Sequence, residues 1–182
     1  MLSLSDPRWS SLDSNYGSGR RVAELLSVAL NNGLDAALYE ELFQSLVHQY
    51  TLSMAAYAAL PHLLEIAQIF PQDRKDLLLL AGWCYACSAL PNAPSLPSDL
   101  AQAWHLVPFR AIPMTAEILK EEIPSQDEMR ALLSVLAAFN GHFSLAFALE
   151  ALDVEIECPQ CGTFFDVINS NLNILSDNTQ SQ

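Results

Sequence analysis

Hydrophobic residues recur at helical spacing over most of this 182-residue chain. After residue 20, apolar side chains fall at i, i+3, i+4, i+7 and i+8, which is the pattern of a helix with one buried face. The residues of this first apolar face are Val22, Leu25, Leu26, Ala29 and Leu30. Gly33 is expected to end the helix, because glycine readily takes the left-handed conformation found at helix C-termini.

Two further helices are predicted before residue 71. The first ends at Leu46 and has Glu40 and Glu41 on its solvent side. The second is expected over residues 52–70, where Glu65 is the one residue charged at pH 7. Pro61 should kink or divide this helix, since proline lacks a backbone N–H and crowds the preceding turn.

The pattern continues with a fourth helix and a broken helical stretch. The fourth helix is expected to begin with Asp73 as its cap and to run to about Leu90. Another helical stretch opens at Ser98 and is expected to break near Pro108 and Pro113.

The C-terminal third begins with a capping signature. Ser125 and Glu128 have the spacing of a capping box at the start of a helix. The inward residues of that helix are expected to be Met129, Leu132, Leu133, Leu136 and Phe139. A last helix is expected over residues 143–152, followed by a short hairpin over 154–167, where apolar residues alternate around a turn.

These elements predict a mainly all-α protein. Residues 1–152 are expected to form one helical domain of stacked antiparallel helix pairs, because the very apolar inner helices need neighbours on both sides. Residues 153–169 are expected to form a small β-hairpin packed on that domain, and residues 170–182 a disordered polar tail.

A motif in the first half of the chain resembles a known family. The motif is Val47-His48-Gln49-Tyr50-Thr51, followed by a helix of small residues that ends in Leu60-Pro61-His62-Leu63-Leu64. It is similar to bacterial HEAT-like helical-repeat proteins of unassigned activity, over about residues 9–90. Tyr50 departs from that pattern, which has glycine at this position. The resemblance implies an α-solenoid whose concave face binds other molecules, and it supplies no catalytic residues.

The charge balance narrows the classes of partner. The chain has 21 acidic and 8 basic residues, for a net charge of −13. Such a surface repels phosphate groups, so we expect no nucleic-acid and no membrane partner, and a basic protein partner instead. The N-terminal segment lacks the basic and apolar regions of a secretory signal, and we expect a cytoplasmic protein.

The cysteines form two CxxC pairs. Cys158 and Cys161 lie in a CPxCG sequence, which is typical of a zinc knuckle and predicts a structural zinc ion. Zinc requires two more ligands, which Cys84 and Cys87 or a histidine could supply. Because Cys84 and Cys87 lie in an apolar helix, core packing is the favoured interpretation for them. A knuckle without metal and a reversible disulfide stay open for the CPxCG pair, and a redox role for either pair is disfavoured.

Few residues indicate catalysis. The sequence contains no P-loop, GxGxxG, GxSxG or HExxH motif. His48 is expected at a helix end, where it would satisfy terminal carbonyl groups. The paired glutamates Glu40/Glu41 and Glu121/Glu122 fit solvated surfaces better than acid–base dyads. We therefore expect a protein that is not an enzyme.

Charge and fold class together suggest a function. Bacterial immunity proteins against basic, nucleic-acid-degrading toxins are often small and acidic. By that analogy the chain is predicted to be an immunity or antitoxin protein, a monomer or small homo-oligomer, with Glu40, Glu41, Glu121 and Glu122 facing a basic toxin. The alternative is a zinc-stabilised adaptor or scaffold protein in a larger assembly.

Overall fold

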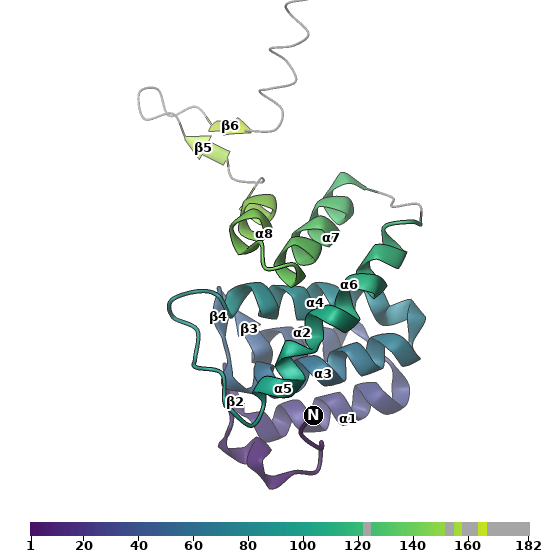
Figure 1. Ribbon diagram of the computed structural model, residues 1–182, viewed down its shortest axis with the longest axis vertical. Coiled ribbons are helices and arrows are strands. Elements are labelled where there is room, and N and C mark those ends of the chain that lie inside the picture. Colours follow the sequence, from purple (N-terminus) through teal and green to yellow (C-terminus); the bar gives the residue numbers. More distant parts are fainter. Residues whose placement is uncertain (122–124, 152–154, 158–163, 167–182) are drawn as a thin grey trace, which may run out of the picture.

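The computed structural model describes residues 1–121, 125–151, 155–157 and 164–166, and it is mainly helical (Figure 1). The α-helices are α1 (Gly19–Asn32), α2 (Ala36–Leu46), α3 (Met54–Ile69), α4 (Arg74–Cys87), α5 (Ala101–His105), α6 (Val107–Ile118), α7 (Gln126–Phe139) and α8 (Phe143–Glu150). Two short 3-10 helices are η1 (Pro7–Ser11) and η2 (Pro71–Asp73). None of the described helices is long and apolar enough to span a membrane.

Three antiparallel hairpins complete the described structure. Their strands are β1 (Asp13–Ser14) with β2 (Gly17–Ser18), β3 (Val47–His48) with β4 (Thr51–Leu52), and β5 (Glu155–Glu157) with β6 (Phe164–Asp166). The last of these confirms the predicted C-terminal hairpin, whose register pairs Glu155 with Asp166. How this hairpin packs on the helices stays a prediction, because the residues that connect it to α8 lie outside the described part of the chain.

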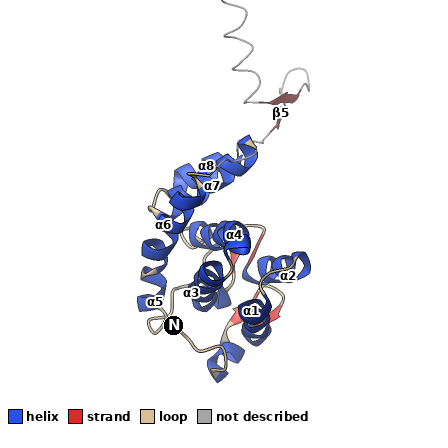
Figure 2. Cartoon of the chain, turned by 90° about the vertical axis from the view of Figure 1, so that its right-hand side faces the viewer, coloured by secondary structure: helices blue, strands red, loops and turns tan. Residues whose placement is uncertain are grey.

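The helices pack largely in the order of the chain. α1 packs on α3, α3 on α4, α4 on α7, and α7 on α8. α2 lies against α1 and α3, whereas α5 and α6 cover α3 from the other side. Figure 2 shows α2 and the α5–α6 segment on opposite sides of α3 and α4.

Local signals set several helix ends, and Gly33 and Ser125 act as predicted. Ser125 Oγ accepts a hydrogen bond from the Glu128 amide at 3.1 Å, as the capping signature predicts. Asp35 caps α2 in the same way, with Leu38 N as donor at 2.8 Å. Gly33 ends α1 with φ of 80° and donates its amide hydrogen to Ala29 O.

The start of the third helix differs from the prediction. α3 begins at Met54, because residues 47–52 form the β3–β4 hairpin. Gln49 and Tyr50 at its tip have φ of 47° and 62°, so both central residues of this turn are left-handed. His48 therefore lies in a strand, and its predicted place at a helix end was wrong.

Other helix predictions also need correction. α3 continues through Pro61 and α6 through Pro113, so neither proline divides its helix, whereas a kink at Pro61 stays a prediction. Asp73 makes no side-chain cap to α4; its Oδ2 accepts a hydrogen bond from Leu34 N at 2.7 Å instead. Met129 and Leu133 are 37% and 40% exposed, because α7 buries only the side that faces α4, α6 and α8.

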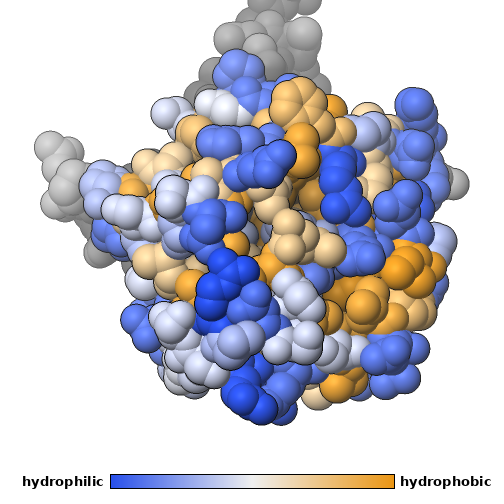
Figure 3. Space-filling view, turned by 60° about the horizontal axis from the view of Figure 1, so that its bottom comes forward, coloured by the Kyte–Doolittle hydropathy of each residue, from blue (hydrophilic) through white to orange (hydrophobic). Residues whose placement is uncertain are grey.

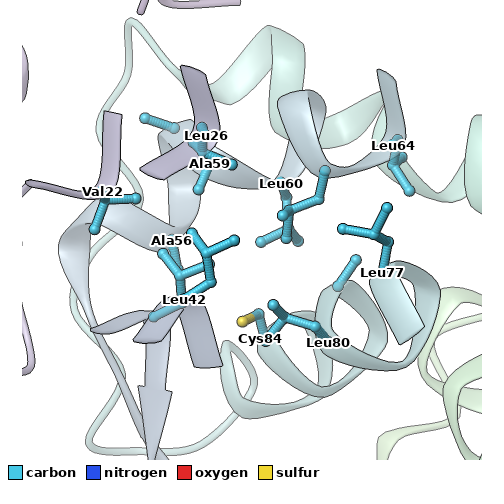
Figure 4. Close-up of a cluster of buried hydrophobic side chains, with 14 of the residues drawn as sticks. Val22, Leu26, Leu42, Ala56, Ala59, Leu60, Leu64, Leu77, Leu80 and Cys84 are labelled. Carbon is cyan, nitrogen blue, oxygen red and sulfur yellow. The ribbon is translucent and has the colours of Figure 1, made fainter. Parts of the chain in front are cut away.

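A single large core lies around α3. Figure 4 shows side chains from α1, α2, α3 and α4 meeting in its centre. Leu26, Leu60 and Leu77 are fully buried there. Burying a leucine side chain contributes roughly 1.5–3 kcal/mol, so this cluster is the main source of the stability of the fold.

The N-terminal segment is anchored on the same core through Trp9. Trp9 is 1% exposed, and its Nε1 donates to Ser3 O at 2.9 Å. His62 of α3 is also buried, and its Nε2 lies 2.8 Å from Leu2 O. The first residues of the chain therefore pack against the centre of α3.

Candidate protein-binding surface

Glu40 and Glu41 lie side by side on α2, but their surroundings differ. Both are exposed. Glu41 forms two hydrogen bonds with Arg21, at 2.7 Å to Nε and 2.9 Å to Nη2. This hydrogen bonding lowers the pKa of Glu41. Glu40 accepts a hydrogen bond from the neutral amide of Gln44, and it forms no ion pair within the described part of the chain.

The second glutamate pair lies elsewhere. Glu121 is exposed after the end of α6, and Glu122 lies outside the described residues. Because α2 and α6 are on opposite sides of the helical core (Figure 2), the structure does not bring Glu121 close to Glu40 and Glu41. The predicted glutamates therefore do not form one compact site.

Most basic side chains are occupied by carboxylates of the chain itself. The ion-paired basic residues are Arg8, Arg20, Arg21, Arg74, Lys75 and Arg130. They leave a large excess of carboxylates, which gives the molecule its negative potential. On the face shown in Figure 3, hydrophilic residues cover most of the surface and hydrophobic residues gather in separate patches.

The two described cysteines are part of the core. Cys84 and Cys87 are fully buried on α4, and Figure 4 shows the Cys84 sulfur among leucine side chains. Burial raises the pKa of Cys87 to about 12 and raises that of Cys84 as well, so both stay protonated thiols. These surroundings agree with core packing, and they disfavour the thiolate form that zinc binds.

The predicted zinc ligands Cys158 and Cys161 lie outside the described residues. Within the described part of the chain, no three His, Cys, Asp or Glu side chains are grouped so as to hold a metal ion. A structural zinc at the CPxCG sequence stays a prediction.

An aromatic surface emerges that the sequence reasoning missed. It consists of Tyr16, His48, Tyr50, Trp83 and Phe147, which come from the β1–β2 turn, the β3–β4 hairpin, α4 and α8. The hairpins that contribute to it lie on the left in Figure 1.

The rings of this aromatic surface form two contacting groups, and the β3–β4 hairpin contributes a residue to each of them. Tyr50 lies 5.3 Å from Trp83 and 6.2 Å from Phe147, measured between ring centroids. Tyr16 meets His48 edge to face at 5.3 Å. Tyr16 and Tyr50 are 63% and 52% exposed. Tyrosine and tryptophan are enriched at the energetic centres of protein interfaces, so this surface has the composition of a binding site.

Comparisons of the chain with family models, with curated proteins and with solved structures give no significant match.

Proposed function

We propose that this chain is a HEAT-like α-solenoid that binds another protein, and that it neutralises a basic bacterial toxin in the cytoplasm without catalysing a reaction. The serial packing of α1, α3, α4, α7 and α8 supports this proposal, since each helix of a solenoid contacts mainly its neighbours. Such a stack offers a long rigid surface to a partner.

The observation that carries the proposal is the occupation of the basic side chains. Six of the eight Lys and Arg residues are engaged in ion pairs, while the chain has 21 acidic residues. Several described carboxylates form no ion pair and are exposed: Asp13, Asp35, Glu40, Asp76 and Glu121. A surface of this kind accelerates encounter with a basic protein and disfavours acidic ones.

In the proposed mechanism, binding itself is the activity. The acidic surface attracts the basic toxin, and the helical scaffold then covers the toxin's active site. Because nucleic-acid-degrading toxins bind phosphate groups with basic residues, an acidic protein competes for the same residues. Glu40, Glu41 and Glu121 would contribute to the attraction from different sides of the molecule.

The proposal is tested with the protein encoded by the neighbouring reading frame, which it requires to be basic. Co-expression of this chain should restore growth to cells that the neighbouring protein poisons. The association rate of the purified pair should fall about tenfold or more between 0.05 and 0.5 M salt, because screening removes the long-range attraction. If no basic neighbour binds and cells gain no protection, the proposed function is wrong.

A further inference from the structure

We propose that the aromatic surface formed by Tyr16, His48, Tyr50, Trp83 and Phe147 is the site that receives arginine side chains of the basic partner. This inference rests on the proposed function and specifies the part of the molecule that makes contact. Guanidinium groups stack on the faces of tyrosine and tryptophan rings, and these three residue types dominate interface hot spots.

The charges around this surface fit a cationic ligand. The β1–β2 hairpin, the β3–β4 hairpin and α8 contain no Lys or Arg, and they carry the carboxylates Asp13 and Glu150. In α4, the basic residues Arg74 and Lys75 lie in the first turn, at the opposite end from Trp83, and both are ion-paired. Arg20 and Arg21 follow the β1–β2 hairpin in the first turn of α1, and both are paired with carboxylates. An incoming arginine therefore meets aromatic faces near basic side chains whose charge is already compensated.

The rings are held in place before binding. Tyr50 has φ of 62°, which costs a non-glycine residue about 1–2 kcal/mol. Its ring contacts Trp83 and Phe147, from two helices that are far apart in the chain. The Asn15 side chain also donates a hydrogen bond to Thr51 O at 3.1 Å, which joins the two hairpins. A preorganised surface binds with a smaller loss of side-chain freedom.

Tryptophan fluorescence can detect the binding of a ligand to this aromatic surface. The chain has three tryptophans. Trp9 and Trp104 are 1% and 5% exposed, so Trp83 is the tryptophan that a ligand in solution can reach. An acetylated and amidated hexa-arginine peptide should change the tryptophan fluorescence when it binds.

The decisive comparison uses two single variants. Tyr50→Gly removes the ring and places the residue best suited to φ of 62° in the turn, so the relief of backbone strain offsets part of the lost ring contacts and the variant should fold. Phe109→Ala removes an aromatic ring that is 77% exposed on α6, outside the aromatic surface. At about 0.15 M salt, Tyr50→Gly should raise the Kd for hexa-arginine about fivefold, whereas Phe109→Ala should change it less than about twofold.

Three outcomes would overturn the inference: no binding of hexa-arginine, equal Kd values for the two variants, or loss of a wild-type dimer in Tyr50→Gly. Equal Kd values would mean that charge alone binds the peptide. Loss of a wild-type dimer in Tyr50→Gly would mean that the surface joins two copies of this chain. The proposed function is tested separately. If Tyr50→Gly protects cells and binds the basic neighbour as well as the wild type does, the aromatic surface is not the contact, but the immunity function stands.

Discussion

Gly82 shows how one residue sets the distance between two helices. A Cβ at this position would lie 2.3 Å from Val135 Cβ on α7, well inside van der Waals contact. α4 and α7 can therefore approach closely only because residue 82 has no side chain. The cost of the glycine in helix propensity, about 0.5–1 kcal/mol, is offset by this packing.

Gly82→Ala should accordingly destabilise the protein by about 1–3 kcal/mol, since the added methyl group forces α4 and α7 apart. Urea unfolding followed by far-ultraviolet circular dichroism measures the change. In an unobstructed helix the same substitution raises stability, so an unchanged or higher free energy of unfolding would contradict the close approach.

His62 shows how burial couples stability to pH. Its side chain is 4% exposed, and desolvation lowers its pKa below the ordinary value of 6.5, although the Leu2 carbonyl and Glu65 act in the opposite direction. Nδ1 is buried and has no hydrogen-bond partner within the described structure. The fold therefore favours the neutral imidazole.

Stability should fall as the pH decreases from about 6.5 towards the lower pKa of the folded state, because the unfolded chain binds a proton there before the folded chain does. Above pH 6.5 the imidazole is neutral in both the folded and the unfolded state, so its protonation does not lower the free energy of unfolding. In His62→Gln this pH dependence should disappear, while the side chain keeps a donor for Leu2 O. Parallel unfolding curves of the two proteins between pH 5 and 7, about the range in which histidine titrates, would contradict the assignment.

At the scale of elements, the connection between α1 and α2 depends on a residue from η2. Asp73 Oδ2 accepts a hydrogen bond from Leu34 N at 2.7 Å, and the same oxygen lies where a side chain on Gly33 would be. The sequence separation is 39 residues. This bond fixes the end of α1 against the start of α4.

Asp73→Ala should lower the free energy of unfolding by about 1–3 kcal/mol, since it leaves the Leu34 amide without its acceptor. Asp73→Asn keeps an oxygen acceptor and should lose less than half as much. Thermal unfolding of the two variants measures the difference. Equal losses would show that the carboxylate charge, not the hydrogen bond, is what matters.

The same elements show what the sequence could predict. Ser125 was predicted correctly as a cap because its partner Glu128 is three residues away, within one turn. Asp73 has an equally good capping position, but a distant amide competes for its carboxylate. The β3–β4 turn uses Gln49 and Tyr50 at positive φ, where the usual glycine or asparagine signal is missing. The sequence therefore predicted helix ends from signals within a few residues. Contacts between residues far apart in the chain account for the ends that differ from the prediction.

In the candidate site, too, the features that could be predicted are those that depend on the sequence alone. The acidic excess is a sum over the sequence and could be predicted, as could the burial of Cys84 in an apolar helix. The aromatic surface could not be predicted, because Tyr16, Tyr50, Trp83 and Phe147 come from four elements that meet only in the folded chain. The one sequence feature that indicated the aromatic surface was Tyr50, which stands where the family resemblance leads us to expect glycine.

At the scale of the whole molecule, the net charge of −13 opposes the compact state. The ion pairs at Arg8, Arg20 and Arg21 are exposed, and pairs of this kind contribute little to stability. Repulsion among the remaining carboxylates should therefore dominate the response of the fold to salt. The range over which this repulsion acts is about 10 Å at 0.1 M ionic strength and shortens as salt is added.

Stability should rise with ionic strength. Between about 0.02 and 0.3 M sodium chloride we expect the free energy of unfolding to increase on the order of 1 kcal/mol, or about 2–4 °C in Tm. Potassium chloride should act equally, since screening depends on ionic strength and not on a specific cation site. Glu40→Gln and Glu41→Gln form a matched pair: at low salt the first removes an uncompensated charge and should raise Tm, while the second breaks the Arg21 pair and should lower it. If Tm falls with added salt, or if both variants lower it, ion pairing and not repulsion governs the charged surface, and the excess of carboxylates no longer supports the function proposed for this chain.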